Sequence, residues 1–268
     1  MLIAQISDMH LKGEGELLYD RVDTTGFLER AVAHLNALEP RPDIVLATGD
    51  LVDNGLPAQY ANLRRVLSAL AMPACLIPGN HDLRAALRGA FPDHGYLRGE
   101  GFLQYTVEGM PVRLIALDTL VEGKHHGALC DVRLDWLEAR LAEQDGPTLL
   151  FMHHPPFDVG IERMDGMGLT EGGERLSALV RRHPNVERIV CGHIHRPIQM
   201  RWAGTLASIA PSTAHQVALD LRAGAKLALR MEPPGGVLHQ WRPGSGLVTH
   251  LSYVGDYETP QPPRKAAA

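Results

Sequence analysis

The chain has 268 residues, of which 45% are hydrophobic and 21% are charged. This is the composition of an ordinary globular protein, and the length allows one large hydrophobic core with at most a small appendage. A formal net charge of -5 excludes a general attraction to nucleic acid or to an anionic membrane, so any affinity for phosphate has to be local.

The cysteines and the N-terminus predict a reduced, cytoplasmic protein. Cys75, Cys130 and Cys191 are an odd number and form no CxxC pair, which argues against a disulfide framework or a thiolate zinc site. The first ten residues, MLIAQISDMH, have no basic start, and their apolar run is too short for a secretion signal or a membrane span. We therefore expect buried thiols and no membrane contact.

Short apolar runs alternate with amphipathic stretches along much of the chain, the pattern of βαβ units in a mainly parallel sheet. The expected strands are residues 2–6, 43–47, 74–77, 148–152 and 186–191, and the expected helices are 24–38, 57–70, 131–143 and 171–182. Residues 103–107 and 112–117 alternate in polarity around a short connection that contains Gly109, which predicts an antiparallel pair. Short strands are expected between residues 198 and 253.

These elements predict an α/β fold: a four-layered α/β/β/α sandwich with two packed sheets, helices outside and a small C-terminal β-rich extension. We expect residues 1–200 to form the core and residues 201–258 to supply its remaining strands and the extension. Residues 259–268, rich in Pro and small residues, are expected to be a disordered tail. Residues 157–174 fit no element, and we expect a Gly- and Met-rich loop that lies over a site or packs on another subunit.

Potential ligands follow five of the predicted strands, at the point where each strand ends. The runs are Ser7-Asp8-Met9-His10, Gly49-Asp50, Gly79-Asn80-His81-Asp82, Met152-His153-His154 and Gly192-His193-Ile194-His195. Because the carboxyl ends of parallel strands share one edge of a sheet, these side chains are expected to converge. Their donors are carboxylate, amide and imidazole groups, which suit Zn, Mn, Fe or Co. The glycines before Asp50, Asn80 and His193 are expected to allow sharp turns.

Each run alone is a weak indication, but the series D-x-H, G-D, G-N-H-D, H-H-P-P and G-H-x-H in this order is highly specific. It resembles the motif series of the calcineurin-like metallophosphoesterases. Over nearly its whole length the chain resembles the bacterial glycerophosphodiesterase and class III cyclic-nucleotide phosphodiesterase branch of that superfamily, with the glycerophosphodiesterases more similar. The segments that carry this likeness are residues 2–8, 76–82, 151–156 and 214–217.

The resemblance implies two divalent metal ions per chain, drawn from Mn, Fe, Zn and Co. By the family pattern one ion would be held by Asp8, His10 and His195 and the other by Asn80, His153 and His193, with Asp50 bridging them. His154 is the alternative to His153, and the family pattern favours His153. Charge arithmetic supports this set: two ions bring four positive charges, and two aspartates and a bridging hydroxide remove three. One positive charge is left for one phosphodiester anion.

The implied activity is hydrolysis of small phosphodiesters, such as glycerophosphodiesters or cyclic nucleotides, by attack of a metal-bound hydroxide. His81 is expected to bind the phosphate or to act as a general acid, with Asp53 orienting it, and Asn80 and His215 to contact the substrate. A solvent-facing His81 and a structural His215 are the alternatives. Tyr19 is a weaker candidate for a residue that leans over the site.

Two other functions remain open. The first is phosphomonoester hydrolysis: the run from Gly49 to Gly55 lacks the arginine that grips a monoester in the phosphoprotein-phosphatase branch, which favours diesters unless Arg196 takes that role. The second is a non-catalytic scaffold, although scaffolds usually lack ligands and this chain has all seven. The resemblance implies two partners: a small phosphodiester substrate, and further copies of the chain in a homo-oligomer. Binding to a nucleic acid polymer is not expected.

Overall fold

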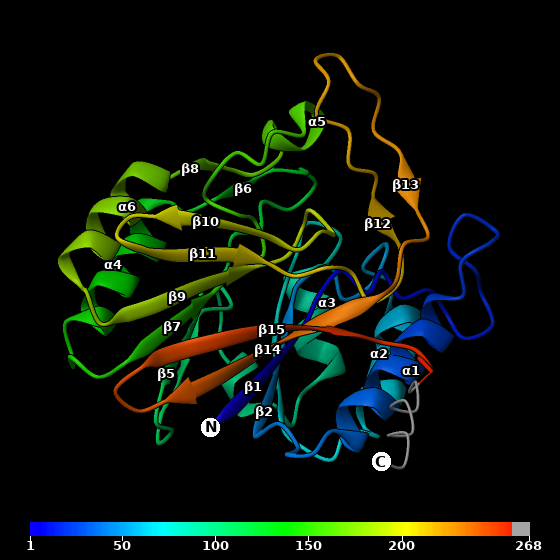
Figure 1. The fold of residues 1–268 in the computed structure, drawn as a ribbon, viewed down its shortest axis with the longest axis horizontal. Helices are drawn as coiled ribbons and strands as arrows, with labels where there is room; N and C mark the ends of the chain where they lie inside the picture. Colours follow the sequence, from blue (N-terminus) through cyan, green and yellow to red (C-terminus); the bar gives the residue numbers. More distant parts are fainter. Residues whose placement is uncertain (259–268) are drawn as a thin grey trace, which may run out of the picture.

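Two β-sheets face each other at the centre of the molecule, and helices cover their outer sides (Figure 1). The computed structural model describes residues 1–258. In spatial order the first sheet contains β15 (Gly246–Tyr253), β14 (Gly235–Arg242), β1 (Leu2–Ile6), β2 (Ile44–Thr48) and β3 (Ala74–Ile77). The second contains β10 (Ile198–Trp202), β11 (Thr205–Ile209), β9 (Val186–Cys191), β7 (Thr148–Phe151), β5 (Arg113–Ala116) and β4 (Tyr105–Val107).

The helices form the outer layers, which confirms the predicted α/β/β/α order. On the side of the first sheet lie α1 (Thr24–Ala37), α2 (Pro57–Leu67) and α3 (Arg84–Ala90), and on the side of the second lie α4 (Asp131–Leu141) and α6 (Gly173–Arg182). The short elements are the 3-10 helix η1 (Gly95–Leu97), α5 (Glu162–Asp165), the pair β6 (Gly127–Ala128) and β8 (Leu169–Glu171), and the pair β12 (Gln216–Val217) and β13 (Leu229–Arg230). Within residues 1–258 no helix has the length and apolar character that crossing a bilayer requires.

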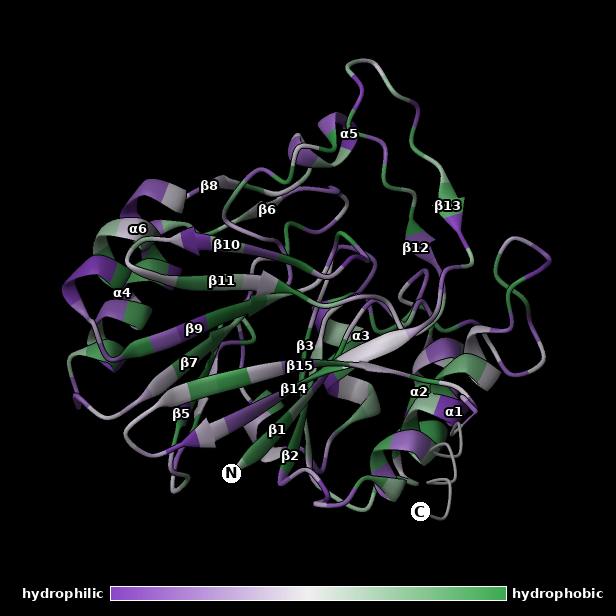
Figure 2. Cartoon of the chain, viewed as in Figure 1, coloured by the Kyte–Doolittle hydropathy of each residue, from purple (hydrophilic) through white to green (hydrophobic). Residues whose placement is uncertain are grey.

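Hydrophobic patterning explains why the central strands form. All five residues of β2 are buried, as expected for a parallel strand covered on both faces, and Figure 2 shows the apolar character of β1 and β2. The pairs β1·β2, β2·β3, β5·β7 and β7·β9 are parallel. The carboxyl ends of these strands therefore lie along one edge of each sheet.

Several elements differ from the sequence prediction. α6 begins at Gly173 instead of residue 171, because Glu171 belongs to β8 and pairs with Ala128 of β6. α3 has only seven residues, too few for a periodic pattern to be recognised, and it was not predicted. β14 and β15 have eight residues each, so the C-terminal strands are not all short.

The segment 157–174 is not a structureless loop. It contains α5 and β8, and Met164 is buried in the hydrophobic core beneath the second sheet. Met167 and Leu169 pack against the same core as partly buried residues. The expectation that its apolar residues need another subunit for burial is therefore wrong for Met164. The disordered tail predicted at 259–268 lies outside the described residues.

A buried polar network joins the two sheets. The Gln5 amide donates to Thr48 Oγ1 at 3.0 Å within the first sheet and to the carbonyl of Cys191 at 2.8 Å in the second. Its amide oxygen accepts from His239 Nε2 at 3.2 Å, and His239 Nδ1 accepts from Thr249 Oγ1 at 2.9 Å. Because His239 is fully buried and lies near Arg188, burial and this cation lower its pKa to about 3.

This network makes stability depend on pH. Between pH 6.5 and about 3 the unfolded chain protonates His239 and the folded chain does not, so acidification destabilises the fold. The slope is about 1.4 kcal/mol per pH unit, which is about 2 kcal/mol between pH 7.5 and 5. Urea unfolding at these pH values should show this loss in the wild type and a smaller loss in His239→Gln. The exposed His250 provides the control, and His250→Gln should keep the wild-type slope.

Candidate metal centre

The side chains that follow the strand ends converge at the seam between the sheets. Asp8 and His10 come after β1, Asp50 after β2, Asn80 and His81 after β3, His153 after β7, and His193 and His195 after β9. All of these are buried except Asn80 and His81, which are half-buried. The structure thus brings together all seven predicted ligands.

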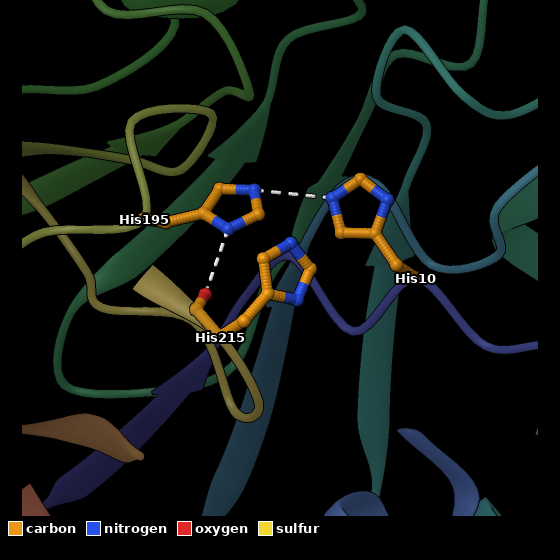
Figure 3. Close-up of side chains that lie close together, drawn as sticks. All are labelled: His10, His195 and His215. Carbon is orange, nitrogen blue, oxygen red and sulfur yellow. Dashed lines mark hydrogen bonds between the residues drawn. The ribbon is translucent and has the colours of Figure 1, made fainter. Parts of the chain in front are cut away.

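The first group consists of Asp8, His10, Asp50 and His195, whose donor atoms all lie within 4.8 Å of one another. His10 Nε2 and His195 Nε2 are 3.0 Å apart, with the rings turned toward each other (Figure 3). Asp50 Oδ2 lies 3.5 Å from His10 Nε2, and Asp8 Oδ1 lies 3.5 Å from His195 Nε2. Two carboxylates and two imidazoles therefore face a common point.

The second group lies on the other side of Asp50. His153 Nε2 is 3.4 Å from Asp50 Oδ1 and 3.2 Å from Asn80 Oδ1. The ring of His193 lies 5.1 Å from that of His153, and His193 Nε2 is buried without a hydrogen-bond partner in the described chain. The two oxygens of Asp50 thus point to two different histidine groups.

Hydrogen bonds to the backbone set which nitrogen of each ring faces the centre. His153 Nδ1 donates to the carbonyl of Thr48 at 2.8 Å, and His195 Nδ1 donates to the carbonyl of His215 at 2.9 Å. In both rings Nδ1 is committed to the backbone, so Nε2 is the nitrogen that faces the centre and would bind an ion. In His154, by contrast, Nε2 donates to the carbonyl of His125 and Nδ1 contacts Thr119 Oγ1, so neither nitrogen is free although the ring lies near His193.

The backbone is strained where it presents these groups. Five of the seven predicted ligands have positive φ angles: Asp8 (53°), His10 (44°), Asp50 (47°), His193 (73°) and His195 (53°). Such angles cost energy in residues other than glycine and concentrate at functional sites. Of the three glycines expected to permit turns, only Gly49 has a positive φ. At Gly79 the requirement is close approach instead, because a Cβ there would lie 2.2 Å from Asp50 Oδ1.

The electrostatics of the centre suit bound cations. Burial and, after it, the nearby His10 lower the pKa of His195 to about 3, and burial holds the pKa of His193 well below its ordinary value. Burial lowers the pKa of His153 as well, but Asp50 reverses this and raises it to about 9. Burial raises the pKa of Asp8 to about 6. Metal ligands must be deprotonated, so a cation would take the place of the proton on His153. The donor set and the unpartnered His193 Nε2 fit two divalent ions.

The residues assigned to the substrate lie beside the first group. The His81 side chain is 31% exposed, and its Nδ1 donates to the backbone carbonyl of Asp53 at 2.7 Å, with the Asp53 carboxylate 3.8 Å away. The Asp53 carboxylate accepts from Lys12 Nζ at 3.2 Å and lies 3.6 Å from His10 Nδ1. His215 is buried 5.4 Å from the His10 ring, with Nδ1 unpartnered in the described chain.

Asp82, the last residue of the Gly79-Asn80-His81-Asp82 run, has a structural role that the motif did not indicate. Its carboxylate accepts from the backbone N–H groups of Leu51 at 3.0 Å and Gly79 at 2.8 Å, and from the Tyr60 hydroxyl at 2.8 Å. It therefore ties the loop after β2 to the loop after β3. Tyr60, on α2, could not be found from the motif, since only the fold brings it there.

A cleft of about 420 Å³ opens in front of these groups. His10, Asp50, Asn80, His81, His193, His195 and His215 form its inner wall. Tyr19, a weak candidate from the sequence, lines it and is 63% exposed. Arg196 does not line it: its guanidinium donates to the carbonyl of Val217 at 2.6 Å and to Glu232 at 2.8 Å.

A family model described as calcineurin-like phosphoesterase matches residues 1–197. The chain belongs to this family. The match confirms the resemblance predicted from the strand-end motifs, and metallophosphoesterases of this kind use a dinuclear centre of divalent metal ions.

Curated relatives within the family are phosphodiesterases. The chain is 41% identical to the "Probable glycerophosphodiester phosphodiesterase GpdQ" of Arcobacter nitrofigilis, over 98% of this chain and 96% of that protein. It is 32% identical to the 3',5'-cyclic adenosine monophosphate phosphodiesterase CpdA of Escherichia coli K12, over 80% of this chain and 76% of that protein. A dimetal phosphatase from Danio rerio shares the fold, with a TM-score of 0.62 at 15% identity over 95% and 99% of the two chains.

Removing the shared carboxylate should disrupt both groups. After chelation, the wild type should take up two equivalents of Mn²⁺ by elemental analysis, and Mn²⁺ at about 100 times its dissociation constant should stabilise the fold by about 2.7 kcal/mol for each occupied site. Asp50→Ala should lose the uptake and the stabilisation while keeping its circular dichroism spectrum. Asp145→Ala, at an exposed position before β7, is the matched control and should behave as the wild type. Two equivalents bound by folded Asp50→Ala would contradict a shared carboxylate.

Proposed function

We propose that the chain is a phosphodiesterase that hydrolyses small phosphodiesters with two divalent metal ions, drawn from Mn, Fe, Zn and Co. The observation that carries the proposal is the Asp50 carboxylate, whose Oδ2 faces His10 and whose Oδ1 faces His153. One ion would be held by Asp8, His10 and His195 and the other by Asn80, His153 and His193. Such a pair of ions supplies an activated water and neutralises charge on the phosphate.

The protein's own groups supply the rest of the chemistry. Asn80 contributes a neutral amide oxygen, which leaves the centre with a net positive charge for a monoanionic diester. His81 is held by the Asp53 carbonyl through Nδ1, so the imidazolium form would have its Nε2–H available to donate to the phosphate or to protonate the leaving oxygen. His215 borders the same cleft and is assigned to substrate contact.

Diesters are favoured over monoesters for two reasons. The run after Asp50 lacks a phosphate-gripping arginine, and Arg196 is engaged by Val217 and Glu232 away from the cleft. The curated relatives that span most of this chain are named as phosphodiesterases of glycerophosphodiesters or cyclic nucleotides. Both substrate classes present the same monoanionic phosphate, which the proposed net charge of the centre matches.

A non-catalytic scaffold is the second candidate from the fold alone. GAP50, the anchor in the inner membrane complex of Plasmodium, shares this fold with a TM-score of 0.61 at 13% identity over 96% and 89% of the two chains. The complete set of seven ligands in this chain argues for catalysis. The cytoplasmic location and the homo-oligomer stay predictions from the sequence.

Two chromogenic substrates test the reaction class. The Mn²⁺-loaded protein should hydrolyse bis(4-nitrophenyl) phosphate with a kcat/KM at least about 10-fold above that for 4-nitrophenyl phosphate. The monoester is a dianion, so its two negative charges exceed the single net positive charge proposed for the centre. A preference for the monoester would identify the chain as a phosphomonoesterase. Hydrolysis of neither ester with Mn²⁺, Zn²⁺, Fe²⁺ or Co²⁺ would favour the scaffold.

Asn80→Asp tests the charge argument. The added carboxylate is a stronger ligand but cancels the net positive charge, so metal affinity should rise while kcat for the diester falls by about 10-fold or more. Affinity is measured by competition with a chelator, and kcat at saturating metal. A variant in which affinity and kcat rise together would show that the neutral amide has no electrostatic role.

A further inference from the structure

The cleft has an outer wall that the proposed chemistry does not use. It is formed by Arg163 and Met167 from the segment around α5 and by Val217, Leu227 and Leu229 from the arm that carries β12 and β13. Figure 1 shows α5 and the tip of this arm on the same side of the molecule. The two are joined where the backbone N–H of Gly224 donates to Glu162 Oε2 at 2.6 Å. The outer wall is therefore one connected surface.

This wall carries one permanent charge, and it is positive. Among residues 1–258, Arg163 is the one arginine or lysine that lines the cleft, and Asp50, which belongs to the predicted ligand groups, is the one carboxylate that does. Arg163 forms no ion pair or side-chain hydrogen bond within residues 1–258. A cation that lacks a protein partner in a cleft is available to a ligand.

The acidic residues around Arg163 already have partners. Glu162 accepts from Gly224, and Asp165 accepts from the backbone of Val159 at 2.6 Å and of Gly160 at 3.1 Å. Asp220 accepts from the Arg222 guanidinium at 2.6 Å. None of these three carboxylates lines the cleft. The outer wall thus offers nothing to balance a positively charged group on a ligand.

We propose that Arg163 is a specificity-determining residue that selects phosphodiesters by the charge of the group farthest from the phosphate. With the phosphate at the inner wall, one alcohol of the diester extends along the apolar outer wall to the guanidinium. A guanidinium binds carboxylate or phosphate oxygens through paired hydrogen bonds and repels a quaternary or primary ammonium group. The preferred diesters carry an apolar chain with an anionic end, and diesters with a cationic head group are disfavoured. This inference rests on the proposed phosphodiesterase activity.

A series of three esters separates the selectivity from the chemistry. Each is a 4-nitrophenyl phosphate diester whose second alcohol is a four-carbon chain that ends in a methyl, a carboxylate or a trimethylammonium group. The leaving group is the same in all three, so differences in kcat/KM report on the chain end. The wild type should prefer carboxylate over methyl over trimethylammonium, with a span of about 3- to 30-fold between the first and the last.

Variants at Arg163 should reorder this series. Arg163→Gln should bring the three values within about 2-fold of one another, with the largest loss for the carboxylate ester, and Arg163→Glu should invert the order. Arg181→Gln, at an exposed position on α6 outside the cleft, is the matched control and should keep the wild-type order. Raising the salt concentration should narrow the wild-type span between the carboxylate and trimethylammonium esters, as expected for an exposed charge.

Two results would overturn the inference while leaving the proposed function intact. One is a wild type that hydrolyses all three esters without ranking them by charge, or an Arg163→Gln variant that keeps the ranking. The other is an equal loss for all three esters in Arg163→Gln, which would place the guanidinium on the shared phosphate. If no ester is hydrolysed by the wild type with any of the four metals, the proposed function itself fails.

Discussion

The position of one carboxylate, that of Asp50, determines the geometry of the whole centre. It leaves the end of β2, the strand between β1 and β3, with one oxygen toward each histidine group. The backbone amide of His81 holds Oδ1 at 2.9 Å. One group is completed from the second sheet by His195 and the other by His153, so the two sheets must keep a fixed separation. The buried Gln5 network and the His153 bond to the Thr48 carbonyl, both of which cross between the sheets, provide that constraint.

Much of the inner wall could be predicted because it depends on local sequence and on one topological rule. Apolar runs locate the strands, and parallel order places their carboxyl ends together. What the sequence does not reveal depends on contacts between distant residues. The engagement of His154 by Thr119 and His125, the link from Asp82 to Tyr60, and the burial of Met164 have no local signal. Part of the outer wall was expected, because the segment 157–174 was predicted to lie over a site and it lines the cleft with Arg163 and Met167. The arm of β12 and β13 that completes the wall was missed, since it comes from a separate segment.

The strained backbone and the close approach of the histidine rings have a common explanation. The ligands of one cation must point their lone pairs at a common point, which brings side chains of the same kind close together. His10 Nε2 and His195 Nε2, for example, are 3.0 Å apart. Positive φ angles at both residues and close packing at Gly79 are the local costs of that convergence. The core stabilises this arrangement, because the preceding strands are buried and cannot shift to relieve it.

The division of the cleft into two walls has a consequence for how selectivity can change. The inner wall consists of strand ends that the core holds rigidly, whereas the outer wall consists of α5 and the arm of β12 and β13. The two walls are connected beside a ligand, because Arg196, next to His195, donates to the carbonyl of Val217 and to Glu232. Substitutions that point into the cleft from the arm, as at Leu227 or Leu229, can change which alcohol is accepted without touching the ligands. Substitutions that break the Arg196 contacts act differently, since they release the backbone that holds His195 at its positive φ.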